Sequence, residues 1–241
     1  MVRNRLVTLV LLPGLDGTGL LFSDFVSSLG PELEAIVVRY PTDQRLSYAE
    51  LESMVRALLP TDRPFVLLGE SFSGPIAIAI SASRPPGLAG LILCCSFARY
   101  PRRLLAKLRA LVPVIPVKGR FVSLVGRVAN RRGVSPALRS RLREVAAKVS
   151  SSVLRARIGE VLRVDVRDKL SEIEVPILYL RASYDGVIPP RASEEIRRLV
   201  PRVRVVEFDA PHFLLQAVAA QAAEVIGEFA RGVVERKKVQ N

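Results

Sequence analysis

The stretch GESFSG, residues 69–74, lies between two apolar runs, FVLL at residues 65–68 and PIAIAI at residues 75–80. Both runs are of the kind that folded proteins bury, and their lengths suit a strand followed by a helix. A polar tetrad between two buried segments indicates a tight strand-to-helix turn. Such a turn is either a plain helix N-cap or a device that holds Ser71 exposed as a nucleophile, and the rest of the sequence has to decide between them.

Strand-like and helix-like segments alternate on both sides of this stretch. The strands that the pattern predicts are residues 6–12, 35–39, 65–68, 91–95, 177–181 and 203–208. The helices that it predicts are residues 20–29, 47–59, 72–83, 191–199 and 214–235. The second of these helices opens on a capping box, Ser47-x-x-Glu50. Fully apolar strands that alternate with helices predict an α/β protein, with a mostly parallel sheet and helices on both of its faces.

Residues 99–169 differ in kind from the rest of the chain. They contain 19 Lys and Arg against 4 Asp and Glu, a net charge of +15, whereas the whole chain carries +13. The segment shows no clear strand, and its apolar residues recur at helical spacing. These stripes are Leu104, Leu108 and Leu111; Leu138, Leu142, Val145 and Val149; and Leu154, Ile158 and Val161. We therefore expect one domain, with a core of residues 1–98 and 170–241 and a basic helical insertion at residues 99–169.

Four loops that follow predicted strands carry residues able to do chemistry. Their sequences are PGLDGTG at residues 13–19, GESFSG at 69–74, SYDGVIP at 183–189 and APHF at 210–213. In parallel α/β sheets, ligands bind beyond the carboxyl ends of the strands, so these loops are expected to meet. Together they supply Ser71, Asp185 and His212, in that order along the chain, and His212 is the single histidine of the sequence.

These motifs resemble those of the α/β-hydrolase family, and the resemblance covers essentially the whole chain. Residues 69–71 stand where the family has its nucleophile elbow, and residues 13–19 resemble its oxyanion loop. Residues 185–189 and 210–216 resemble its acid loop and its histidine loop. The resemblance implies an α/β-hydrolase fold, with the family's helical cap at the position of the basic insertion between two core strands.

The sequence departs from the family pattern at three points. Ser73 takes the place of the last glycine in G-x-S-x-G, with Gly74 one step later, and we expect this small side chain to fit the elbow. Pro13 stands where histidine is common. The chain begins directly on the strand before the oxyanion loop, so the family's first two strands are expected to be absent.

The resemblance assigns catalytic roles to Ser71, Asp185 and His212, and the chemistry of these residue types agrees. Serine is a poor nucleophile until a base takes its proton, and histidine is the usual base near neutral pH. Asp185 would orient the imidazole and stabilise its protonated form. Two neighbours compete for these roles: Ser73, which is predicted to lie inside the helix, and Asp209, which is expected to shape the turn before the histidine.

The glycine-rich loop and the elbow are expected to supply an oxyanion hole. The resemblance assigns its two N–H donors to the amides of Leu15 and Phe72, and the positive end of the following helix adds to them. Gly14 and Asp16 are expected to contact the substrate, and a second role stays open for Asp16, that of making the turn of its loop. Glu70 is expected near the mouth of the site, solvated or paired.

The expected reaction is acyl transfer to water through a covalent acyl-enzyme. The aliphatic stripes of the insertion favour carboxylic esters of aliphatic acyl groups, with a small-molecule ester as the substrate. A thioester, or an acyl ester linked to an acyl-carrier protein, is the alternative, because one triad serves both reactions. Two non-enzymatic alternatives are a ligand sensor on the same fold and a basic nucleic-acid-binding protein. The second is disfavoured because the insertion holds only two aromatic residues for base stacking, Tyr100 and Phe121.

No cofactor is expected. A metal site is disfavoured because the chain has one histidine and lacks C-x-x-C and H-E-x-x-H spacing. Cys94 and Cys95 are expected to be small core residues in a reducing compartment. No apolar run approaches the roughly 18 residues that cross a membrane, so we expect a cytoplasmic protein without a transmembrane segment. The charge of the insertion is expected to be either a solvated face or a surface that attracts an anionic or acyl-carrier partner.

Overall fold

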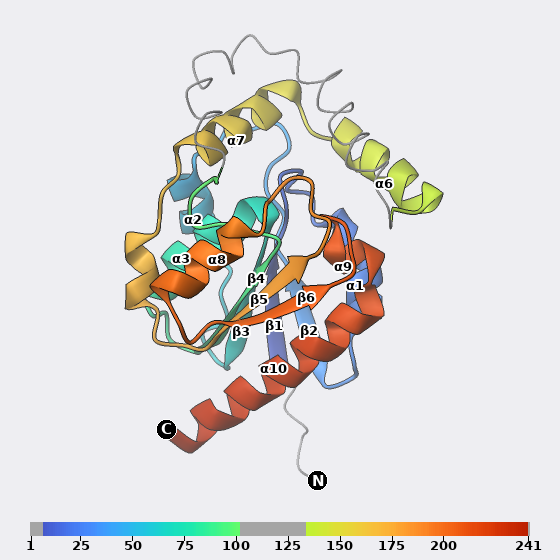
Figure 1. The fold of residues 1–241 in the computed structure, drawn as a ribbon. Coiled ribbons are helices and arrows are strands. Elements are labelled where there is room, and N and C mark those ends of the chain that lie inside the picture. Colours follow the sequence, from blue (N-terminus) through green and yellow to red (C-terminus); the bar gives the residue numbers. More distant parts are fainter. Residues whose placement is uncertain (1–6, 102–133, 241) are drawn as a thin grey trace.

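One parallel sheet forms the centre of the protein in the computed structural model, which describes residues 7–101 and 134–240 (Figure 1). Six strands of the described chain lie in the order β2-β1-β3-β4-β5-β6, and each neighbouring pair is parallel. The strands are β1 (Val7–Leu12), β2 (Leu33–Val37), β3 (Phe65–Glu70), β4 (Leu88–Cys94), β5 (Ile177–Ala182) and β6 (Arg204–Phe208). Each lies within a few residues of a predicted strand.

Burial of the strands follows their apolar pattern. Every residue of β1, β3 and β4 is buried, whereas β6 at the edge of the sheet is partly exposed. In the parallel register, Leu12 at the end of β1 pairs with Gly69, and Glu70 at the end of β3 pairs with Cys94. The carboxyl ends of these three strands therefore lie side by side, and the loops that follow them leave the sheet at one place.

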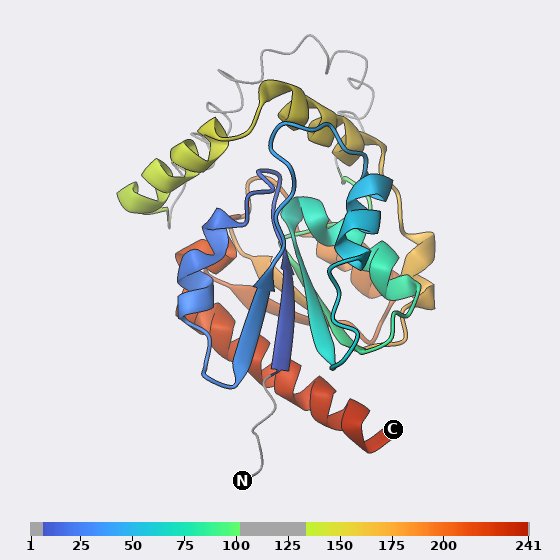
Figure 2. The same cartoon turned by 180° about the vertical axis from the view of Figure 1, so that it is seen from behind.

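Helices cover both faces of the sheet (Figures 1 and 2). One face carries α2 (Tyr48–Arg56), α3 (Gly74–Ala82) and α8 (Arg191–Leu199), and the other carries α1 (Ser23–Ser27), α9 (Leu214–Ala217) and α10 (Ala219–Gln240). The predicted capping box opens α2: the Ser47 hydroxyl accepts from the Glu50 amide, and the Glu50 carboxylate accepts from the Ser47 amide. Within the two described ranges, no helix has the length and the apolar character that crossing a membrane requires.

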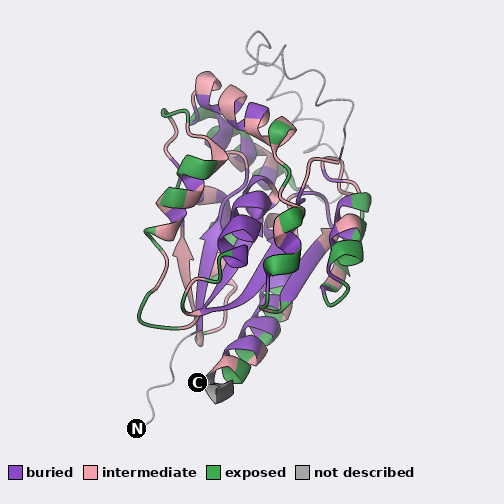
Figure 3. Cartoon of the chain, turned by 90° about the vertical axis from the view of Figure 1, so that its left-hand side faces the viewer, coloured by how far each residue is buried: buried purple, intermediate pink, exposed green. Residues whose placement is uncertain are grey.

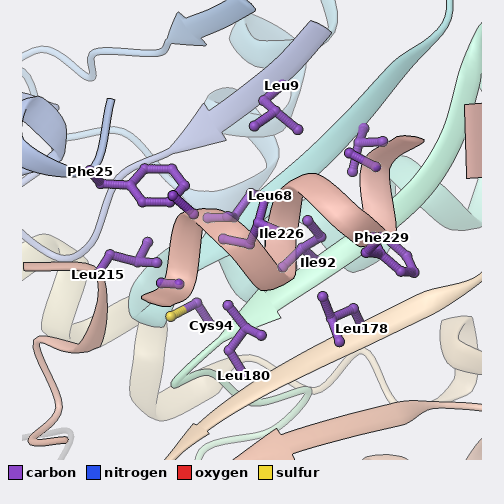
Figure 4. Packing of buried hydrophobic residues seen from close by; sticks show 14 of the residues in the cluster. Leu9, Phe25, Leu68, Ile92, Cys94, Leu178, Leu180, Leu215, Ile226 and Phe229 are labelled. Carbon is purple, nitrogen blue, oxygen red and sulfur yellow. The ribbon is translucent and has the colours of Figure 1, made fainter. Parts of the chain in front are cut away.

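The core on the α10 side shows how helix and sheet interlock. Leu9, Leu68 and Ile92 lie on β1, β3 and β4 with no exposed surface, and Ile226 and Phe229 of α10 belong to the same cluster (Figure 4). Figure 3 shows that buried residues gather in the strands and on the inward sides of the helices. Burying one side chain of this size is worth about 1.5–3 kcal/mol. This packing fixes the strands, and with them the loops at their carboxyl ends.

Three of the predicted helices are each divided into two shorter helices in the structure. A short 3-10 helix, η1 (Leu20–Phe22), precedes α1, and another, η2 (Ser71–Ser73), precedes α3. The final helix, predicted as one element over residues 214–235, is interrupted at Val218, whose φ of −131° and ψ of 45° are not helical. Both α9 and α10 bury apolar residues, so the apolar pattern runs on across the break and does not reveal it.

In the described part of the chain between β4 and β5, α6 (Pro136–Ala147) and α7 (Ser151–Arg163) lie across the carboxyl ends of the strands (Figure 1), and a 3-10 helix, η4 (Asp168–Glu172), leads back to β5. The apolar stripe of α6 packs against Leu21 of η1, and that of α7 forms a small cluster with Val149. An antiparallel bridge joins Arg99 to Asp165, where the segment leaves the core and returns to it. The predicted stripe of Leu104, Leu108 and Leu111 lies outside the described residues. The division of the chain at residues 99–169 stays a prediction.

Candidate active site

The turn between β3 and η2 holds Ser71 in an unusual backbone conformation. Its φ of 48° lies in the left-handed region, which costs a non-glycine residue about 1–3 kcal/mol and persists only where surrounding contacts fix it. One such contact is the Ser96 hydroxyl, which donates a 2.6 Å hydrogen bond to the carbonyl oxygen of Ser71. Gly74 makes room for this hydroxyl, because a Cβ atom at that position would collide with it. Neither Glu70 nor Ser73 caps the helices here with its side chain, so residues 69–74 form a strained turn and not a plain N-cap.

Ser73 points away from the site into the protein. Its side chain is fully buried, its hydroxyl donates to the carbonyl oxygen of Pro13, and it accepts a 2.8 Å hydrogen bond from the Tyr40 hydroxyl. The close approach of strand and helix falls at Gly69, where an added Cβ would lie 2.9 Å from the carbonyl oxygen of Ser73. Within this turn, Ser71 is therefore the serine that faces the histidine.

Ser71, His212 and Asp185 form one chain of hydrogen bonds. The Ser71 hydroxyl lies 2.9 Å from Nε2 of His212, and Nδ1 of His212 lies 2.7 Å from Oδ2 of Asp185. Because an ionised carboxylate only accepts, Nδ1 carries the proton of the neutral imidazole and Nε2 is left to accept from Ser71. The other carboxylate oxygen, Oδ1, accepts from the amides of Val187 and Ile188 at 2.7 and 2.8 Å. The structure thus brings together three residues from three separate loops.

Burial and charge oppose each other at this histidine and aspartate. Burial alone lowers the pKa of His212, but the charge and hydrogen bond of Asp185, with a smaller contribution from Glu70, outweigh it and raise this pKa above its ordinary value. Burial raises the pKa of Asp185, but His212 and the two backbone amides outweigh it and hold this pKa below its ordinary value. Asp185 therefore stays ionised near neutral pH, where it stabilises a protonated imidazole.

Glu70 is buried, with 6% of its surface exposed, so of the two states expected for it, solvated or paired, the structure shows the paired one. Its carboxylate accepts a 3.0 Å hydrogen bond from the Gln216 side chain of α9, and it also accepts from the amide of Gly14. Burial raises the pKa of Glu70 to about 7, against the hydrogen bond from Gln216 and with the help of the nearby Asp16 carboxylate. The sequence signal for this burial was the position of Glu70 directly after an apolar strand. In the structure, β3 runs two residues further than predicted and takes Glu70 into the interior.

The residues predicted to form the oxyanion hole lie after two strands that pair beside the elbow. β1 and β3 pair up to Leu12 and Gly69, so the loop with Leu15 and the turn with Phe72 leave the sheet next to each other. Leu15 is half-buried in its loop, and Phe72 follows Ser71 at the start of η2. The role of their amides as oxyanion donors stays a prediction.

For Asp16, the geometry supports the turn-forming role. Its carboxylate accepts from the amide and the hydroxyl of Thr18 at 2.8 and 2.5 Å. The turn is closed by a 3.0 Å hydrogen bond from the Gly17 amide to the Gly14 carbonyl, and Gly17 has a φ of 71°, which favours glycine. A substrate contact by Gly14 or Asp16 stays a prediction.

Two tyrosines outside the predicted set brace the elbow. Tyr48 stacks on Phe72 with ring centres 4.7 Å apart, and its hydroxyl donates a 2.8 Å hydrogen bond to the Phe72 carbonyl. Its amide donates a 2.9 Å hydrogen bond to the carboxylate of Glu160 on α7. Tyr40 bonds Ser73 and meets the ring of Phe72 edge-on. Neither tyrosine belongs to a motif, so the sequence gives no local signal for these contacts.

One group of described residues has the composition of a metal site. The ligand atoms of Cys95, Asp185 and His212 all lie within 4.8 Å of one another. A metal ion held by these three would take imidazole and carboxylate atoms that now bond to each other and to Ser71, so metal binding there would compete with the hydrogen-bond chain. Cys94 and Cys95 are both buried thiols of the core.

A family profile matches most of this chain. The family described as "Hydrolase_4: Serine aminopeptidase, S33" aligns with residues 46–210, more than half of the sequence. The aligned range includes Ser71 and Asp185 and stops two residues before His212.

Curated relatives share about a quarter of the aligned positions. A "Pimeloyl-[acyl-carrier protein] methyl ester esterase" of Neisseria meningitidis serogroup A is 26% identical over 195 residues, which are 72% of this chain and 59% of that protein. A protein of the same description from Vibrio campbellii is 26% identical over 218 residues, which are 83% of this chain and 85% of that protein. The match thus spans about three fifths of the first relative's length and most of the second's.

Solved structures share the fold over nearly the whole chain. An enol-lactonase from Burkholderia xenovorans has a TM-score of 0.82 at 18% identity, covering 93% of this chain and 91% of its own. A thermophilic esterase from Thermogutta terrifontis has a TM-score of 0.78 at 22% identity, covering 95% and 90%. At such identities the likeness shows the fold alone, and it confirms the predicted fold class.

Proposed function

Because this chain belongs to the Hydrolase_4 family of α/β-hydrolases, we propose that it is a serine hydrolase that cleaves carboxylic esters of aliphatic acyl groups. The observation that carries the proposal is the hydrogen-bond chain from Ser71 through His212 to Asp185, with links of 2.9 and 2.7 Å. A serine hydroxyl in a strained turn, beside a buried imidazole whose other nitrogen faces a carboxylate, is the arrangement that acyl transfer requires.

The reaction proceeds in two halves. The Ser71 oxygen attacks the ester carbonyl carbon while Nε2 of His212 takes the hydroxyl proton, and the tetrahedral intermediate collapses as His212 gives that proton to the departing alcohol. His212 then takes a proton from water, whose oxygen attacks the acyl-enzyme, and the free acid leaves as Ser71 regains its proton. Asp185 stays ionised throughout and stabilises the imidazolium that forms in each half.

The amides of Leu15 and Phe72 act as the oxyanion donors in this scheme. Phe72 directly follows the nucleophile, and Leu15 lies in the loop that leaves the sheet beside the elbow. A donor aimed at the developing oxyanion contributes about 2.7–4 kcal/mol to transition-state stabilisation. The strained backbone of Ser71 serves the same end, because it turns the Phe72 amide out of the strand direction.

An apolar wall beside the histidine favours an aliphatic acyl group. Leu138 and Leu142 of α6 cluster with Leu21, and the partly buried ring of Phe213 packs against the same cluster. Phe213 directly follows His212, and the two rings meet edge-on with centres 5.6 Å apart, so this cluster borders the histidine.

A second candidate substrate is a thioester, or an acyl ester linked to an acyl-carrier protein. The description of the pimeloyl-ester relatives favours the carrier-linked ester, since it names an ester on an acyl-carrier protein. The net charge of +15 on residues 99–169 also favours it, because a basic surface attracts an acidic partner.

Active-site labelling and ester turnover test the proposal together. A fluorophosphonate should label wild-type protein at Ser71, and Ser71→Ala should lose the label and at least about 10³-fold in kcat on p-nitrophenyl butyrate. Ser73→Ala is the matched control and should keep the label, because its hydroxyl is buried. A Ser71→Ala protein that keeps most of its activity, or a wild-type protein that neither labels nor turns over, would show the proposal to be wrong.

The two substrate candidates are separated with one acyl chain in three forms: a p-nitrophenyl ester, a small thioester and a methyl ester attached to an acyl-carrier protein. A kcat/KM that is highest for the carrier-linked ester assigns the protein to the carrier-linked class. A kcat/KM that is highest for the free ester assigns it to small-molecule ester hydrolysis.

A further inference from the structure

Arg157 on α7 is a cation in the interior of the protein. Its exposed fraction is 2%, whereas Arg155, two residues earlier on the same helix, is only half-buried. An arginine on a solvated helix face keeps its guanidinium in water. A solvated face therefore does not account for Arg157, although it remains a possible role for the rest of the insertion's charge.

Backbone carbonyls hold this guanidinium. Nη1 of Arg157 donates to the carbonyl oxygens of Leu15 and Asp16 at 2.9 and 2.6 Å, and Nη2 donates to the carbonyl oxygen of Pro41 at 2.9 Å. Its Cζ atom lies 5.7 Å from the centre of the Tyr40 ring. Within the described part of the chain, Arg157 forms no ion pair with a carboxylate.

Burying a cation without a carboxylate partner is costly unless dipoles replace the lost water. Burial lowers the pKa of Arg157, and the nearby Asp16 and Tyr40 oppose this shift. The three carbonyl dipoles compensate the guanidinium only while they converge on it. The contact therefore restrains the loop as much as it restrains the arginine.

The loop is shaped around the guanidinium. Gly17 has a φ of 71°, and a Cβ atom there would lie 2.6 Å from Nη2 of Arg157. The Gly17 amide donates to the Gly14 carbonyl, and a trans peptide points the Leu15 N–H in the opposite direction from that carbonyl. This turn thus sets the direction of the Leu15 amide. Arg157 holds the same turn at the next two carbonyls along the chain, those of Leu15 and Asp16.

We propose that Arg157 is a positioning residue, which holds residues 14–17 in the turn that presents the Leu15 amide to the reacting carbonyl oxygen. The inference rests on the proposed function, in which that amide is an oxyanion donor. Because Arg157 belongs to α7, the docking of α7 on the core and the shape of the oxyanion loop are coupled. A 2.9 Å hydrogen bond from the Ser150 amide to the Thr42 carbonyl ties the start of α7 to the core beside the same contact.

The kinetic test compares Arg157→Met with Arg155→Met on p-nitrophenyl butyrate. Misplacing a donor by about an ångström costs on the order of 10²-fold, so kcat of Arg157→Met should fall about 100-fold with little change in KM. Arg155→Met removes a charge from the same helix and should keep the wild-type kcat. Methylguanidinium should restore part of the kcat of Arg157→Ala and leave the kcat of Arg155→Ala unchanged.

An activity-free measurement separates this inference from the proposed function. Hydrogen–deuterium exchange of peptides covering residues 13–19 should be faster in Arg157→Met than in wild-type protein and unchanged in Arg155→Met. Wild-type protein that turns over no ester would overturn the proposed function, and the exchange comparison would still decide whether Arg157 holds the loop.

Three outcomes overturn the inference: a folded Arg157→Met protein with wild-type kcat, unchanged exchange in the loop, or a kcat that methylguanidinium does not raise. If Arg157→Met does not fold, Arg157→Lys decides instead. Lysine keeps the charge and the stem but lacks the fork that reaches several carbonyls at once, so its kcat should fall while its folding is kept. A wild-type kcat in Arg157→Lys overturns the inference.

Discussion

Glu70 touches both the loop of Gly14 and the helix after His212, and its ionisation changes the field at the imidazole. Its negative charge is one of the influences that raise the pKa of His212. Glu70→Gln removes that charge and keeps the size of the side chain, so the pKa of His212 should fall. Because the base must be neutral to accept a proton, the acid limb of the kcat/KM profile should move to lower pH. A limb that does not move would show that Glu70 is uncharged where the histidine titrates.

The same substitution changes how stability depends on pH. Folding raises the pKa of Glu70 from its usual 4.5 to about 7. A raised folded-state pKa contributes stability that is fully present below the unfolded value of 4.5 and is lost as the pH rises through about 7. Relative to wild type, Glu70→Gln should therefore be more stable at about pH 8 than at about pH 5. Urea unfolding measures the free energy of unfolding of the variant and of the wild type at the two pH values. The same difference between the two proteins at both pH values would contradict the raised pKa.

Asp185 is the carboxylate that orients the imidazole, and Asp209 provides its control. Asp185→Asn should lower kcat about 10⁴-fold with the fold intact, because an asparagine no longer favours the tautomer that leaves Nε2 free to accept. Asp209 is exposed, and its carbonyl and carboxylate oxygens accept from the hydroxyls of Tyr184 and Ser183. Asp209→Asn should keep a near-normal rate. The reverse pattern of rates would transfer the role to Asp209.

The contact between β3 and α3 is close because residue 69 is a glycine and has no side chain. A Cβ atom on Gly69 would lie 2.8 Å from Cβ of Ala77 and 2.9 Å from the carbonyl oxygen of Ser73. Strand and helix would have to separate, so Gly69→Ala should lower the free energy of unfolding by about 1–3 kcal/mol. It should also lower kcat, since Ser71 stands at the joint. Denaturant unfolding and steady-state kinetics measure the two effects.

Gly159 inside α7 is the matched control for that prediction. A Cβ atom there meets nothing nearer than 3.5 Å, an ordinary contact with the end of the Arg163 side chain. Gly159→Ala should raise the free energy of unfolding by about 0.5–1 kcal/mol, because alanine loses less backbone entropy than glycine when a helix forms. If Gly69→Ala also raised the free energy of unfolding, strand and helix would separate at Gly69 at no cost.

Apolar periodicity predicts the six described strands and most of the helices, because burial on a sheet or a helix face leaves a repeating pattern. The order of the serine, aspartate and histidine loops predicts which side chains meet. The contacts of Arg157 could not be predicted, because Arg157 and Leu15 lie 142 positions apart in the sequence. No local sequence pattern indicates which backbone carbonyls accept from a guanidinium. The burial of Glu70 was not predicted because β3 extends two residues beyond the predicted strand.

Across the protein as a whole, the positive charge is concentrated in one segment of the sequence, of which the structure describes residues 99–101 and 134–169. Residues 99–169 carry a net +15, and α6 and α7 lie over the carboxyl ends of the strands (Figure 1). If this charge attracts an anionic or carrier-linked acyl substrate, kcat/KM for that substrate should fall as salt rises from about 20 to 500 mM, because steering is screened over roughly 8–10 Å. The kcat for a small neutral ester should barely change.

Charge reversal on α6 provides the control for the salt experiment. Reversing Arg139 and Arg143 should weaken the salt dependence for the anionic substrate and leave neutral-ester turnover unchanged. Arg102 and Arg103 belong to the same basic insertion, but they lie outside the described residues. An equal response of both substrates to salt would assign the charge to solubility.

The bridge between Arg99 and Asp165 brings the two ends of the insertion to the spacing of paired strands, about 4.5–5.5 Å between Cα atoms. The Val166 amide, which donates to the Ala98 carbonyl at 3.0 Å, extends this junction. To the core, residues 100–164 are one closed loop, and the entropy of closing a loop grows only slowly with its length. We therefore expect that a shorter, longer or unrelated segment can be grafted between these two anchors without moving the sheet. Such a graft should change the substrate preference, and it should keep the reaction only if it brings its own donor to the carbonyls of Leu15 and Asp16.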